Sequence, residues 1–219
     1  MISSQELVSE LLSKPDVKLV IDQVSEELAK EQQKRHEFYE WLDEDKKAEF
    51  VNGEIILHSP VMKRHNDSVK ALLKLLDTYV LVHKLGHVGV EKTLVALSRN
   101  DYEPDLCFFK KEKAKNFKKN QHIFPVPDFV VEVWSDSTKD YDETTKFEDY
   151  QKHSVEEYWM IDADKEIVMQ YQLMNEKYEL ILKSGEGKIT SKAVEGFSIP
   201  IRAIFDNELH LETLFSFKK

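Results

Sequence analysis

The sequence predicts an α/β fold in which helices flank a mixed β-sheet, with a helical extension at the N-terminus. Helical and strand-like patterns follow one another in the order helices, hairpin, long helix, strands, helix, strands. The 219 residues contain only 6 Gly and 6 Pro, and no Gly/Pro-rich linker divides them. We therefore expect an extension of residues 1–44 and one α/β domain of residues 45–219.

Two helices are expected in the extension. Ser3 and Ser4 precede a short amphipathic run, which predicts a capped helix that ends before Pro15. A longer helical pattern covers residues 17–42, charged in its middle and aromatic near its end.

The domain is expected to begin with a hairpin and a long helix. In AEFVNGEIIL (48–57), Asn52 and Gly53 tolerate the positive φ angles that a type I′ turn requires between two strands. Apolar residues recur at helical spacing from about residue 65 to residue 85, and we expect Gly86 to end this helix as its C′ residue.

The rest of the chain reads mainly as strands. A helix is expected at about 142–153, and residues 199–205 are expected to open a last short helix. The strand-like runs cover residues 87–98, 102–110, 128–134, 157–162, 166–173 and 178–183.

Composition and charge indicate the cellular location that we expect for the protein and the partners that it is expected to bind. Cys107 is the single cysteine, so no internal disulfide can form and a reducing, cytoplasmic location is expected. No apolar run is long enough to span a bilayer, and the N-terminus does not resemble a signal peptide, so we expect no membrane association. The net charge of −10 argues against nonspecific adhesion to nucleic acid.

One segment has the opposite charge. KKEKAKNFKK (110–119) contains six lysines and one acidic residue. It is either a solvated loop or an arm that contacts phosphates on an otherwise acidic protein, and composition does not decide between them. The lysines are Lys110, Lys111, Lys113, Lys115, Lys118 and Lys119.

Two strands each carry one carboxylate among apolar residues. Alternation in EPDLCFF places Asp105 on the face of Cys107, and alternation in DFVVEVW places Glu132 on the face of Trp134. A buried carboxylate is costly unless a cation or metal compensates it. If the strands are neighbours, Asp105 and Glu132 would converge on a hard divalent ion, with the Val133 carbonyl as a third oxygen ligand. The alternative is that both acids face solvent on half-exposed strands.

The helix that follows offers further polar groups. Asp142, Lys146 and Tyr150 are four residues apart and align on one helical face. This face would deliver a cation and a hydroxyl to the end of the strand that carries Glu132, where a lysine stabilises charge on a phosphoryl group. Alternatively, Asp142 and Lys146 form an ordinary surface ion pair and Tyr150 packs on the sheet.

These residues resemble the PD-(D/E)XK nuclease superfamily. Within it, the chain resembles the bacterial "putative restriction endonuclease" family, which is abundant in cyanobacteria, over roughly residues 46–205. The resemblance rests on EFVNGEIILHSP, RHNDSVKALLKLL, EPDLCFF, PDFVVEVWSDSTKDYDETTKFEDY and VEEYWMID.

The resemblance implies roles for particular residues. Most of the superfamily has a lysine two residues after the strand carboxylate, where this chain has Trp134. The family instead takes its lysine from the next helix, in a D-x-x-x-K-x-x-x-Y pattern that Lys146 and Tyr150 match. By resemblance, Asp105 and Glu132 would bind Mg²⁺ or Mn²⁺, and Lys146 would be the catalytic lysine.

Two further positions match polar positions of the family. Glu54, just after the hairpin turn, and His65, near the start of the long helix, are carried as secondary site candidates. Their alternatives are a surface acid on a hairpin and a helix N-terminal residue without a chemical role.

The resemblance implies metal-dependent hydrolysis of phosphodiester bonds in DNA, with nucleic acid as partner and a homodimer left open. Three features depart from the family: SDST stands where S-P-S-T is common, the net charge is acidic, and the N-terminal helices are additional. The alternative is a catalytically silent nuclease-fold module that binds nucleic acid or protein.

Overall fold

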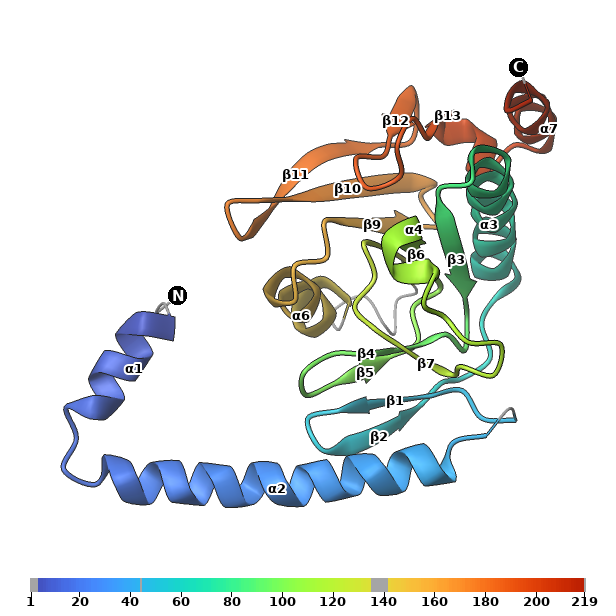
Figure 1. The fold of residues 1–219 in the computed structure, drawn as a ribbon. Helices are drawn as coiled ribbons and strands as arrows, with labels where there is room; N and C mark the ends of the chain where they lie inside the picture. Colours follow the sequence, from blue (N-terminus) through green and yellow to red (C-terminus); the bar gives the residue numbers. More distant parts are fainter. Residues whose placement is uncertain (1–3, 44, 135–141, 219) are drawn as a thin grey trace.

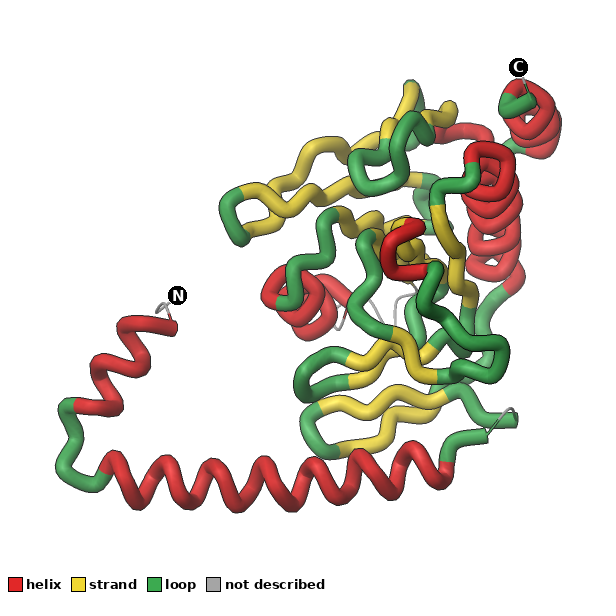
Figure 2. The backbone as a smooth tube through the Cα atoms, viewed as in Figure 1, coloured by secondary structure: helices red, strands yellow, loops and turns green. Residues whose placement is uncertain are grey.

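The computed structural model describes residues 4–43, 45–134 and 142–218 (Figures 1 and 2). The SDST segment at 135–138 and Ser3 lie outside the described residues. The helices are α1 (Ser4–Leu12), α2 (Val17–Trp41), α3 (Lys63–His83), α4 (Lys111–Ala114), the π-helix η1 (Asp142–Lys146), α6 (Phe147–Lys152), the 3₁₀-helix η2 (Ile201–Ile204) and α7 (Asn207–Ser216).

The strands in the N-terminal half of the domain are β1 (Ala48–Val51), β2 (Glu54–Leu57), β3 (Gly86–Val90), β4 (Leu94–Ala96), β5 (Asp101–Tyr102), β6 (Leu106–Lys110) and β7 (Ile123–Phe124). Those that follow are β8 (Phe129–Trp134), β9 (Glu157–Asp162), β10 (Ile167–Met174), β11 (Lys177–Ser184), β12 (Lys188–Thr190) and β13 (Ser198–Pro200).

The predicted mixed α/β architecture is confirmed. In the described part of the chain, a six-stranded sheet has the order β11-β10-β9-β8-β6-β3, with β8 and β9 parallel and the other pairs antiparallel. A smaller sheet, ordered β2-β1-β5-β4-β7, lies beside it (Figure 1). Strands β12 and β13 pair separately.

The central strands β6 and β8 are buried on both faces. Leu106, Phe108 and Val131 belong to one core cluster, to which α3 contributes its apolar stripe. Cys107 and Val130 belong to a second cluster on the opposite face. The faces predicted by alternation in these strands are therefore confirmed, and continuous apolar character is what burial of both faces requires.

The predicted hairpin is confirmed in register and turn. Val51 pairs with Glu54, and Asn52 and Gly53 have φ angles of 52° and 83°. The expected role of Gly86 is wrong. Lys84 adopts the left-handed conformation at the end of α3, whereas Gly86 starts β3, where a Cβ atom would lie 2.0 Å from the Phe109 carbonyl oxygen. Glycine is needed for this close approach rather than for ending the helix.

The N-terminal helices differ in how they contact the domain. The last turns of α2 pack on the small sheet, where Phe38 is buried and stacks on Phe50. The first half of α2 and all of α1 project away from both sheets (Figure 1). Among the described residues, no helix combines the length and the apolar character needed to cross a membrane.

Candidate active site

Asp105 and Glu132 meet at one end of the central strands. Strands β6 and β8 pair antiparallel, with Leu106 opposite Val131. Continued by one residue, this register places Asp105 opposite Glu132, so both side chains leave the sheet on the same face. The Val133 N–H donates a hydrogen bond of 2.8 Å to Asp105 Oδ2, which ties the two strand ends together. Both carboxylates are buried.

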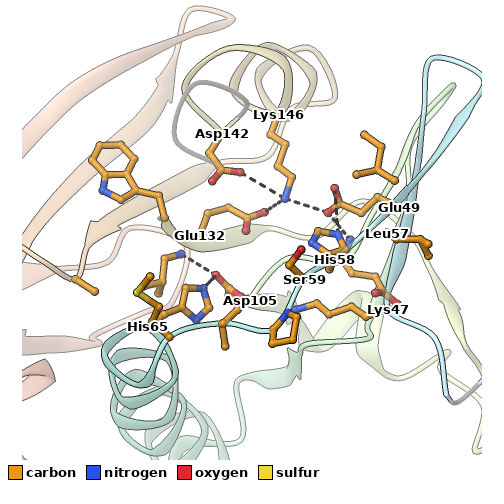
Figure 3. A pocket seen from close by; sticks show the side chains of 18 of the residues that line it. Lys47, Glu49, Leu57, His58, Ser59, His65, Asp105, Glu132, Asp142 and Lys146 are labelled. Carbon is orange, nitrogen blue, oxygen red and sulfur yellow. Dashed lines mark hydrogen bonds and ion pairs between the residues drawn. The ribbon is translucent and has the colours of Figure 1, made fainter. Parts of the chain in front are cut away.

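A cavity of about 380 Å³ opens beside the two carboxylates (Figure 3). It lies between the ends of β6 and β8, the hairpin β1–β2 and the start of α3. Its polar walls include Lys47, Glu49, His58, Arg64, His65, Glu103, Asp105, Glu132, Asp142 and Lys146, and its apolar walls include Ile56, Leu57, Val61 and Met62.

Lys146 reaches into the cavity from the helical segment that follows β8. Its Nζ lies 2.9 Å from Glu132 Oε1, 3.0 Å from Glu49 Oε1 and 3.5 Å from Asp142 Oδ1 (Figure 3). The Tyr150 hydroxyl donates a hydrogen bond of 3.2 Å to Glu132 Oε1. The structure thus brings the predicted lysine and tyrosine to the strand carboxylate. The first turn of this segment is π-helical, a form that often marks functional sites.

The charges around Lys146 determine its protonation. Burial by itself would lower the pKa of the ammonium, but the carboxylates of Glu132, Glu49 and Asp142 hold it well above its ordinary value. Lys146 is therefore a permanent cation at neutral pH. Burial raises the pKa of Glu132 well above its ordinary value, because Lys146 offsets only part of the cost of burying a charge, and the surrounding carboxylates raise it further.

The donor set fits a hard cation that keeps part of its hydration shell. Among the described residues, no three Asp, Glu, His or Cys side chains are grouped closely enough to hold a metal ion alone. Asp105 and Glu132 still offer two carboxylates on neighbouring strands, and the buried Glu49 Oε2 lacks a hydrogen-bond partner. Mg²⁺ is commonly held by one or two carboxylates and several waters.

Comparison with known proteins identifies the family. Residues 35–202 match the family model Uma2, described as "Putative restriction endonuclease". The chain belongs to this family. The resemblance expected from the sequence is thereby confirmed, and the matched residues include all of the cavity walls named above. Among curated proteins, none matches the chain.

A solved structure supports the fold independently of sequence. The protein is similar to the crystal structure of "a putative nuclease belonging to DUF820" from Anabaena variabilis, with a TM-score of 0.65 and 17% sequence identity. The match covers 84% of this chain and 98% of the other. At this identity the likeness concerns the fold alone.

Glu49 is a cavity residue of the Uma2 domain that the sequence analysis did not select. It lies on β1, is fully buried and contacts Lys146 and, at 3.6 Å, His58 Nε2. Although burial opposes ionisation, Lys146 and His58 lower the pKa of Glu49 to about 2. The signal was present in AEFV, where Glu49 stands between apolar residues of a strand, just as Glu132 does.

Glu54 is not brought to the cavity. It follows the hairpin turn on the edge strand β2, its side chain is 79% exposed, and its closest ionic partner is Lys34 at 3.6 Å. The hairpin therefore presents Glu49 from its inner strand, whereas Glu54 stays at the surface.

His65 lies beside Asp105, as the family position suggested. Its Nε2 is 3.1 Å from Asp105 Oδ2, because the first turn of α3 faces the end of β6. Burial would raise the pKa of Asp105, but the hydrogen bonds from His65 and Val133 lower it below its ordinary value. Asp105 is thus held as a carboxylate.

The lysine-rich segment lies at the other end of β6. Asp105 precedes the first residue of β6, whereas Lys110 is its last, and five residues of strand separate their Cα atoms by about 17 Å. Lys110 pairs with Glu156, and Lys113 pairs with Asp128 at 2.9 Å. None of the six lysines lines the cavity described above.

Proposed function

We propose that this Uma2 protein hydrolyses phosphodiester bonds of DNA with the help of Mg²⁺ or Mn²⁺. The observation that carries the proposal is the meeting of Glu132 with Lys146, at 2.9 Å, at the end of a strand whose neighbour carries Asp105. Two strand carboxylates and one lysine are the groups that the PD-(D/E)XK resemblance implies for this reaction.

Asp105, Glu132 and the Val133 carbonyl would hold the metal ion. A divalent ion bound there would lower the pKa of a water molecule and polarise a phosphate oxygen. Asp105 suits this role because His65 and the Val133 N–H keep it ionised.

Lys146 would act as a fixed positive charge. Since neighbouring carboxylates hold its pKa well above the ordinary value, it cannot accept a proton at neutral pH. Its role would be to neutralise charge that develops on the phosphoryl oxygens. Burial and Glu132 keep the pKa of the Tyr150 hydroxyl high, so this group remains a hydrogen-bond donor that orients Glu132.

The lysine-rich segment would contact the nucleic-acid backbone away from the reacting phosphate. Lys115, Lys118 and Lys119 are exposed at the end of β6 opposite the cavity. If they contact phosphates, replacing all three by Ala will reduce the salt dependence of DNA binding by a slope of about 2 to 3. An unchanged slope would show that the segment is only a solvated loop.

A non-catalytic binding module is the second candidate. It is favoured by the absence, among the described residues, of a group of three side chains that could hold a metal ion, and by the net charge of −10. Such a module would keep the fold and the buried ion pairs without cutting nucleic acid.

One experiment separates the two. The protein, Asp105→Asn and Glu132→Gln are incubated at low salt with supercoiled, linear and single-stranded DNA and with RNA, with and without Mg²⁺ or Mn²⁺. Glu54→Gln, which changes an exposed acid, is the matched control. Metal-dependent cleavage that both site variants lose and the control keeps supports the proposal.

Three other outcomes would each contradict a part of this proposal. Cleavage that persists in both site variants would remove Asp105 and Glu132 from the mechanism. Cleavage of RNA alone would leave the chemistry and overturn the substrate. Absence of cleavage, together with no heat of Mn²⁺ binding by calorimetry, would assign the protein to the non-catalytic class.

A further inference from the structure

A single stripe of side chains runs along the whole of α2. Residues 17, 21, 24, 28, 31, 35 and 38 are separated alternately by four and three positions. This spacing is that of the a and d positions of a heptad repeat, which face one side of a helix and form the contact surface of coiled coils. We call residues 17, 21, 24 and 28 the free half of the stripe, and residues 31, 35 and 38 the docked half.

The docked half is covered by the protein's own domain. Glu31 accepts hydrogen bonds of 2.7 and 2.8 Å from Arg99. Arg35 donates two hydrogen bonds to the buried Asp101, and Phe38 is fully buried. The docked half therefore lies against the domain, and the free half continues the same row beyond it.

The free half is apolar and exposed. Ile21, Val24 and Leu28 are 46%, 50% and 47% exposed, and Val17, at the start of the row, is half-buried. Figure 1 shows this half of α2 extending beyond the small sheet, with no element of the described chain lying on it. The other sides of the helix carry ion pairs such as Lys18–Asp22, together with Leu19, which is 72% exposed. A continuous row of exposed apolar residues at heptad spacing is typical of a surface that binds another helix.

We propose that the free half of the stripe binds the same half of α2 from a second copy of the chain, with the two helices antiparallel. A parallel pair is blocked by the fold. In a parallel pair, residues 31–38 of the second copy would lie against residues 31–38 of this chain, a space that the domain already fills through Asp101 and Arg99.

The antiparallel arrangement has no such conflict. The second copy's α2 begins at Val17, opposite Leu28, which is the last stripe residue before the domain. The free half of one copy is therefore as long as the free half of the other copy that it has to cover. Val17 meets Leu28 and Ile21 meets Val24 at each end of a twofold axis, so the surface is complementary to itself.

The flanking side chains tolerate this alignment. Lys18 faces Ser25 of the second copy, and Val20 faces Glu27 of the second copy, so the pairing brings no like charges together. The surface lies outside residues 35–202, and the inference is independent of the proposed hydrolytic function.

The first test is the mass of the full-length protein by light scattering coupled to gel filtration. A dimer has twice 25.7 kDa, about 51 kDa. Val24→Glu, which places a charge within the stripe, is expected to halve this mass, whereas Gln23→Glu, which adds the same charge one position away on the exposed side, is expected to leave it unchanged. Circular dichroism confirms that both variants fold.

Other masses overturn the proposal. A wild-type protein that is monomeric at about 100 μM has no such interface. A monomer that binds phospholipid vesicles, and loses this binding in Val24→Glu, would assign the stripe to a lipid surface. A dimer that persists in Val24→Glu is held together elsewhere.

The second test determines the direction of the helices. The only native cysteine, Cys107, is fully buried, so an introduced cysteine is the one accessible thiol. Val17→Cys and Leu28→Cys proteins are treated with a short bis-maleimide, separately and after mixing. The antiparallel pair predicts a crosslinked dimer only in the mixture. Crosslinking of each variant on its own would mean parallel helices and overturn the alignment.

Discussion

Two buried carboxylate regions of this protein differ in how completely their oxygens are satisfied. Glu157, on β9, has no exposed surface, and both oxygens accept several hydrogen bonds. The donors are the Trp159 indole, the Gln170 amide, the Ser191 hydroxyl and the backbone N–H groups of Lys192 and Ala193. This carboxylate closes the loop after β12 onto the sheet and has no room for a ligand.

The cavity carboxylates are arranged in the opposite way. Glu49, Glu132 and Asp142 all approach one cation, Lys146, and Glu49 Oε2 has no hydrogen-bond partner. A carboxylate saturated by donors stabilises the fold, whereas carboxylates that share a cation beside an open cavity retain capacity for a further cation. The difference separates a structural acid from a candidate catalytic one.

The largest effect is expected at Glu132. If Glu132 binds the metal ion, Glu132→Gln will reduce the rate of metal-dependent DNA cleavage by about 1000-fold, about 4 kcal/mol of transition-state stabilisation. Because the substitution removes one of several crowded carboxylates, the free energy of unfolding in urea is not expected to fall. Full activity of the variant would contradict the assignment.

Glu157→Gln should show the reverse. Its new amide N–H₂ would face donors where a carboxylate oxygen now accepts, so the free energy of unfolding should fall by about 3 kcal/mol. Cleavage per folded molecule should remain. A stable Glu157→Gln protein would end the distinction between the two regions.

Lys146→Met tests the shared cation. Without the ammonium, the carboxylates of Glu49, Glu132 and Asp142 are left uncompensated. The free energy of unfolding should therefore fall by up to about 3 kcal/mol. Mn²⁺ should restore part of this loss by replacing the missing charge, which thermal denaturation with and without the ion would measure. No response to Mn²⁺ would argue against a cation site there.

The smallest effect concerns pH. Burial raises the pKa of Glu103, at the cavity wall, to about 7 from an ordinary value of 4.5. Because the folded protein binds this proton more tightly than the unfolded chain does, protonation of Glu103 stabilises the fold. This contribution is fully present below pH 4.5 and is lost as the pH rises through 7. Glu103→Gln should therefore lose less stability than the wild type between pH 5 and pH 7.5 in urea titrations. Parallel pH profiles of the two proteins would contradict this expectation.

Local patterns were sufficient for much of the fold. Asn52–Gly53 predicted the turn because few residues adopt its φ angles, and alternation around Cys107 and Val130 predicted which side chains share a core. Gly86 was misjudged because its requirement comes from Phe109, a residue on another strand. Sequence spacing carries no information about such an approach.

The candidate site was predictable where a carboxylate broke an apolar strand. Asp105 and Glu132 met this criterion, and the helical spacing of Lys146 and Tyr150 indicated that both would face them. Glu49 met the same criterion but was passed over for Glu54, because a four-residue strand does not reveal that all its residues are buried. Only the packing of β1 between its two neighbours decides which acid of the hairpin enters the cavity.

The π-helical turn of η1 makes the length of this segment as important as its composition. A π-helical turn contains about one residue more than an α-helical turn. Deleting a single residue between Asp142 and Lys146 would convert this turn into an α-helical one and would leave the two side chains on nearly the same face. Each inserted residue would instead add a rotation of up to about 100° and turn the ammonium away from Glu132, so related proteins should rarely gain residues here.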